Sequence, residues 1–74
     1  MSMTITQAIQ HIKFLITVKE GERRAVRRFI HSPKARPTEQ DKLVNRLMEI
    51  DAEIYYLQCD LLDLQRILID EKVA

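Results

Sequence analysis

Leucine and isoleucine residues in the second half of the chain recur at alternating steps of four and three residues. A period of 3.5 residues places them all on one edge of a helix and holds that edge against a partner helix. The pattern therefore predicts a long helix with a continuous packing seam. We interpret the following eight residues as an intramolecular seam: Leu43, Leu47, Ile50, Ile54, Leu57, Leu61, Leu64 and Leu68.

Cap and turn residues divide the chain into two helices. Thr4 and Gln7 have the spacing of a capping box, which marks the start of a first helix. Ser32 precedes Pro33, and the residue before a proline is disfavoured in helical angles, so this helix should end near there. Thr38 is a favourable N-cap for a second helix, because its hydroxyl can accept from a free amide.

These signals predict an all-α protein, which the single glycine and the abundance of helix-forming residues also favour. A short connection between two long helices favours an antiparallel two-helix hairpin. We predict one domain with the following bounds: domain 1–74, first helix about 4–31, loop 32–37, second helix about 38–72.

The first helix carries a broad apolar stripe that is weak in the middle. If the helices pair residues whose numbers add up to about 70, Lys19 lies near Glu53, and Gly21 lies near Ile50. Gly21 then has two interpretations. It permits a close helix approach or a local kink, or it is a tolerated glycine on an exposed turn. The stripe consists of Ile5, Ala8, Ile9, Ile12, Leu15, Ile16, Val18, Ala25, Val26, Phe29 and Ile30, and the acids expected near Lys19 are Glu49, Asp51 and Glu53.

A second apolar line runs along the second helix, about 150° around the helix from the seam. A single partner helix cannot cover two lines so far apart, so the second line predicts an oligomer or partner interface. A symmetric homodimer that forms a four-helix bundle is the favoured arrangement, and a helix of another protein is the alternative. The line consists of Met48, Ala52, Tyr55, Cys59, Leu62 and Ile69, continues to Val73 and is interrupted by Arg66.

The sequence offers no pattern that indicates catalysis. The soft metal ligands His11, His31 and Cys59 do not lie three or four residues apart, and a lone cysteine excludes an internal disulfide. Phosphate-binding glycine loops and nucleophile motifs are absent from the sequence. We expect a protein that is not an enzyme and has no metal or cofactor.

The N-terminal residues lack the features of a signal peptide and no apolar run could span a membrane, so we expect a cytoplasmic protein.

Basic residues gather near the predicted loop. Residues 1–40 hold eight basic and three acidic side chains, whereas residues 41–74 hold four and eight. This uneven distribution of charge has three interpretations. The two helices attract each other, or the basic residues contact a nucleic-acid backbone, or they contact an acidic protein or membrane surface. The possible polyanion-binding residues are Arg23, Arg24, Arg27, Arg28, Lys34 and Arg36.

Two functional hypotheses follow from these surfaces. The first is a helical interaction protein, such as an adaptor or assembly component, that acts by self-association or by packing on a partner helix. The alternative is a small nucleic-acid-binding regulator that uses the basic end of the hairpin.

Overall fold

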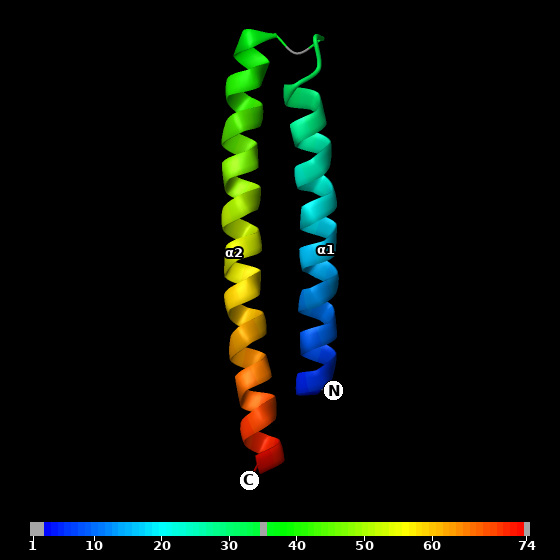
Figure 1. Cartoon of the computed structure of the whole chain (residues 1–74), viewed down its shortest axis with the longest axis vertical. Helices are drawn as coiled ribbons and strands as arrows, with labels where there is room; N and C mark the ends of the chain where they lie inside the picture. The colour runs from blue at the N-terminus through cyan, green and yellow to red at the C-terminus, as the bar shows by residue number, and fades with distance from the viewer. Residues whose placement is uncertain (1–2, 35, 74) are drawn as a thin grey trace.

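The protein is an antiparallel pair of helices in a computed structural model, which describes residues 3–34 and 36–73. Helix α1 spans Ile5–Ile30 and helix α2 spans Pro37–Val73. The two helices pack side by side along an elongated body of 56 × 18 × 18 Å (Figure 1). The predicted all-helical hairpin is therefore confirmed.

The two helices begin with different caps. At α1, the amide of Gln7 donates to Thr4 Oγ1 at 3.1 Å and the amide of Thr4 donates to Gln7 Oε1 at 3.0 Å, which confirms the capping box. At α2, Pro37 is the first helical residue, and Arg36 before it accepts the first helical hydrogen bonds through its carbonyl oxygen. Thr38 therefore lies inside the helix, and its assignment as the N-cap was wrong. Proline suits the first helical position because its missing amide hydrogen would have no partner there.

The core is small and lies along the facing edges of the helices. Among the described residues, the buried hydrophobic side chains are Ile9, Ile50 and Ile54, and Ile50 is fully buried. All eight residues of the leucine and isoleucine seam are buried or half-buried. The seam residues of α2 are thus the least exposed side of that helix, as expected for the side that packs on α1.

The register agrees with the expected pairing. Lys19 lies against Glu53, Glu22 against Arg46, and Arg23 against Asp51, so the paired residue numbers add up to about 70. Because α1 is shorter than α2, the C-terminal end of α2 projects beyond the start of α1 (Figure 1). The last turns of α2 therefore have no neighbouring helix within the hairpin.

Gly21 does not mark a close approach between the helices. A Cβ atom added to Gly21 would meet only the Arg24 guanidinium, at 3.9 Å, and no atom of α2 within 4 Å. Its φ angle is not positive either. The close-approach interpretation was wrong, because Gly21 does not lie on the side of α1 that faces α2.

Candidate functional site

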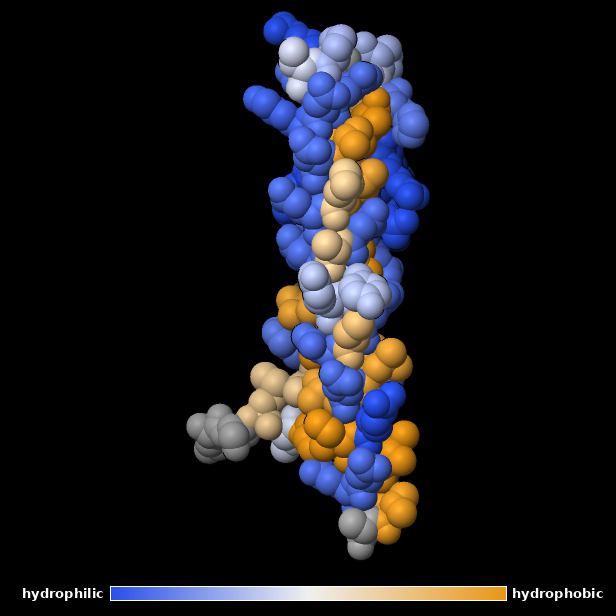
Figure 2. Space-filling view, turned by 90° about the vertical axis from the view of Figure 1, so that its left-hand side faces the viewer, coloured by the Kyte–Doolittle hydropathy of each residue, from blue (hydrophilic) through white to orange (hydrophobic). Residues whose placement is uncertain are grey.

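The outer side of α2 carries a line of exposed apolar residues, which we call the outer line. Its large members are exposed by 44 to 82%, well above the seam residues of the same helix. Figure 2 views this side and shows apolar side chains along the helix, gathered most densely toward its C-terminal end. The outer line consists of Val44, Met48, Ala52, Tyr55, Cys59, Leu62, Ile69 and Val73.

Helical spacing explains why the outer line is exposed. Met48, Tyr55, Leu62 and Ile69 follow one another at steps of seven, so they share one edge of α2 that is turned away from the seam. The sequence interpretation had identified these residues but missed Val44, which lies one turn before Met48 and is 44% exposed. The step of four between Val44 and Met48 was the signal that could have included it. Cys59 is the half-buried member of the line and a free thiol.

Helix α1 leaves fewer apolar residues exposed. Phe29 and Val18, which were assigned to the broad stripe, are about half exposed, and Ala25 is exposed as well. Their assignment to the packed stripe was wrong, because one partner helix covers a narrower arc than that stripe occupies. Phe14, which the sequence interpretation did not single out, is 64% exposed.

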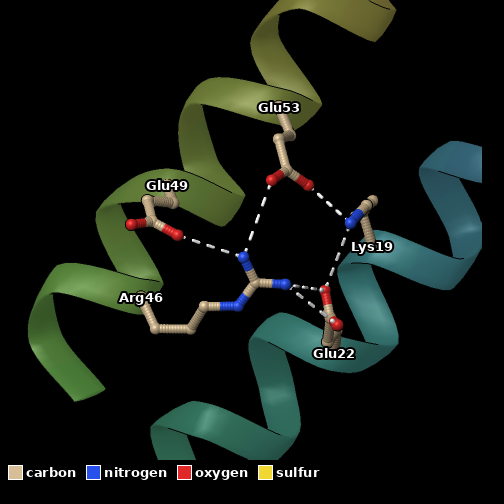
Figure 3. Close-up of polar contacts among 5 residues, drawn as sticks. All are labelled: Lys19, Glu22, Arg46, Glu49 and Glu53. Atoms are coloured by element: carbon tan, nitrogen blue, oxygen red, sulfur yellow. Dashed lines mark hydrogen bonds and ion pairs between the residues drawn. The ribbon is translucent and has the colours of Figure 1, made fainter. Parts of the chain in front are cut away.

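A cluster of five charged side chains joins the middle of the two helices (Figure 3). The Arg46 guanidinium donates to Glu22 at 3.2 Å and to Glu49 at 3.1 Å, and it lies 3.6 Å from Glu53. Lys19 pairs with Glu53 and lies 3.5 Å from Glu22. The hydrogen bond from Lys19 holds the pKa of the Glu53 carboxyl below its ordinary value and raises the pKa of Lys19.

This cluster joins α1 to α2 through the ion pairs of Lys19 with Glu53 and of Arg46 with Glu22. Every carboxylate in it lies against a cation, and all five side chains remain partly exposed to water. Of the other two acids expected near Lys19, Glu49 pairs with Arg46 and Asp51 pairs with Arg23, each at 3.1 Å. Carboxylates neutralised in this way hold the register of the hairpin, because shifting one helix along the other would separate several pairs together.

Beside the cluster lies a shallow groove between the helices, with a cavity volume of about 310 Å³. Leu15, Tyr56 and Leu57 contribute its apolar lining, and Asp60 contributes a carboxylate at the rim. Tyr56 is exposed and its ring meets that of Tyr55 edge to face, with ring centroids 5.7 Å apart. Within the described residues, no three histidine, cysteine or acidic side chains come together as metal ligands.

The basic residues near the connection differ in whether an acidic side chain neutralises them. Arg23 is half-buried and neutralised by Asp51, whereas Arg24, Arg27 and Arg28 are exposed and make no ion pair with any described residue. Arg23, Arg24 and Arg27 line a small cleft of about 190 Å³ together with Glu20. Lys34 and Arg36 are exposed in the connection between the helices. The end of the hairpin near the connection therefore presents several positive charges to solvent, and we call it the basic end: Arg24, Arg27, Arg28, Lys34 and Arg36.

No helix in the described part of the chain has the length and apolar character needed to cross a membrane. Comparisons of the chain with models of protein families, with curated proteins and with solved structures found no match. The described part of the chain thus presents two distinctive surfaces, the outer line and the basic end.

Proposed function

We propose that the protein is a non-enzymatic helical association protein that acts through the outer line of α2. The observation that carries this proposal is the contrast between the two sides of α2. The side that faces α1 holds the buried Ile50 and Ile54, whereas the opposite side exposes large hydrophobic residues from Val44 to Val73. Exposed apolar surface of this length is typical of a protein interface.

The surface area of the hairpin supports association. The chain exposes 6058 Å², whereas a compact monomer of 8.8 kDa exposes about 4,800 Å². The excess of about 1,300 Å² is larger than the roughly 800 Å² that each partner buries in a standard interface. Pairing through α2 would therefore remove part of this excess surface. Two hairpins paired in this way form a four-helix assembly, suited to an adaptor or an assembly component.

The mass of the protein in solution tests this proposal. At micromolar concentration, light scattering should give twice the chain mass of 8.8 kDa. Leu62→Gln should lower the dimer fraction, because it puts an amide into the apolar contact. Phe14→Gln is the matched control, since Phe14 is similarly exposed but lies on α1. A stable, helical monomer at tens of micromolar would refute self-association.

The basic end supports a second candidate function, the binding of a nucleic-acid backbone. The specific observation is that Arg24, Arg27 and Arg28 are exposed and unneutralised by the described residues. Binding of an RNA or DNA oligonucleotide should then weaken steeply with salt, because phosphate contacts release counterions. Replacing these three arginines by glutamine should abolish binding, whereas replacing the exposed lysines Lys13 and Lys72 should not. Equal affinity for both variants would exclude this function.

A further inference from the structure

The large residues of the outer line of α2, taken together with Asp51 and Arg66, are spaced symmetrically about one point of the helix. From Val44 forward, the steps are four, three and four residues. From Val73 backward, they are again four, three and four. The midpoint lies between Gln58 and Cys59. The two halves of this pattern are Val44, Met48, Asp51 and Tyr55 in one direction, and Val73, Ile69, Arg66 and Leu62 in the other.

A pattern of this kind fits a two-fold axis. In a symmetric dimer, each residue at a given distance from the axis meets the residue at the same distance on the other side. Antiparallel contact of α2 with a second α2 would place Tyr55 against Leu62 and Met48 against Ile69, each twice. The large residues of the outer line would therefore meet one another, whereas Ala52 would meet Gln65 and Cys59 would meet Gln58.

The charges on the outer line favour the antiparallel direction. Arg66 would meet Asp51 of the second copy, and the symmetry would repeat this pair. Arg66 is exposed and makes no ion pair with any described residue, although Asp63 and Asp70 lie within one turn of it. Asp51 uses Oδ1 to bind Arg23, and its side chain remains 48% exposed. Parallel contact would instead oppose Asp51 to Asp51 and Arg66 to Arg66, which is unfavourable.

The projecting end of α2 also fits this arrangement. Ile69 and Val73 lie in the last turns of α2, beyond the start of α1, and are 60% and 82% exposed. In the antiparallel dimer, the first turns of the second α2, with Met48 and Val44, would cover them. The same contact places the basic end of one hairpin beside the acidic C-terminal part of the other, which adds electrostatic attraction.

We propose that a second copy of this chain docks on the outer line, with α2 antiparallel to α2 about a two-fold axis between Gln58 and Cys59. This inference rests on the proposed self-association and adds its partner, direction and register. Each α1 then lies on the flank of a central α2 pair.

Distances between spin labels test the register. Labels are placed on Cys59→Ser protein at a new cysteine, either Asp63→Cys or Lys72→Cys, because both residues are exposed. With a rise of 1.5 Å per residue, the two copies should be separated along the axis by about 14 Å at residue 63 and about 40 Å at residue 72. Similar short distances at both positions would show a parallel dimer and overturn the proposal. Any other pair of values would overturn the register but leave self-association intact.

Charge variants that keep Cys59 provide an independent test. Arg66→Asp should raise the dimer dissociation constant about tenfold, and Asp51→Arg should act in the same direction, because each opposes like charges at two symmetric contacts. An equimolar mixture of the two variants should recover dimers, since every contact in the mixed dimer pairs opposite charges. In a parallel dimer, residue 66 meets residue 66 of the second copy, so Arg66→Asp would replace a contact between two positive charges by one between two negative charges. The dimer dissociation constant would then stay unchanged. A dimer unaffected by Arg66→Asp refutes the proposed pairing, whereas a wild-type monomer refutes self-association itself.

Discussion

Replacing Gly21 by alanine should stabilise the hairpin. Gly21 lies in the interior of α1 with an ordinary helical φ angle, and the added Cβ would contact only the flexible Arg24 side chain at 3.9 Å. The substitution therefore creates no strain in the folded state. Alanine is favoured over glycine in a helix interior by about 1 kcal/mol, because glycine loses more backbone freedom on folding.

A gain of about 1 kcal/mol corresponds to a rise in Tm of about 4–8 °C for a domain of 60–100 residues. The rise is measured by circular dichroism during heating, at a fixed protein concentration because association also changes Tm. Ala25→Gly is the matched control. Ala25 is exposed on the same helix, so this variant should lose a similar free energy of unfolding.

An unchanged or lowered Tm of Gly21→Ala, together with the expected fall of Tm for Ala25→Gly, would refute this prediction. That combination would mean that residue 21 needs the space or the backbone freedom of glycine. Such a need would come from a contact outside the isolated hairpin, because α2 offers no atom near this position.

Three other perturbations test the core, the cap and the charged cluster. Ile50→Val should lower the free energy of unfolding in urea by about 1 kcal/mol, because Ile50 is fully buried, whereas Ile67→Val at a half-exposed site should change it little. Thr4→Ala should cost about 1 kcal/mol and reduce helicity at the start of α1, since it removes the acceptor for the Gln7 amide; an unchanged stability would contradict a role for the cap. The pKa of Glu53 is lowered from its ordinary value of 4.5 by Lys19, so its contribution to stability is complete above that value and is lost as the pH falls through the lowered pKa. Glu53→Gln should therefore flatten the fall of Tm between about pH 5 and pH 2, and a fall as steep as that of the unchanged protein would contradict this role of Glu53.

The helices and their pairing were predictable because they depend on local patterns. The heptad seam, the Thr4 capping box and the two prolines specify where helices form and which edge of α2 is apolar. The antiparallel register follows from the short connection, and the contact of Lys19 with Glu53 agrees with it. Most of the outer line was visible for the same reason, because helical spacing alone separates it from the seam.

Only the tertiary structure decided which side chains of α1 face α2. The apolar stripe of α1 spans more of the helix than one neighbour covers, and the exposure of Phe29 and Val18 shows that both fall outside the contact. The rotation of α1 about its axis also turns Gly21 away from α2 and brings Arg23 to Asp51, leaving Arg24 and Arg27 unneutralised by the described residues. The sequence thus determined which faces of each helix are apolar, and the rotation of each helix about its axis determined which of those faces remain available to a partner.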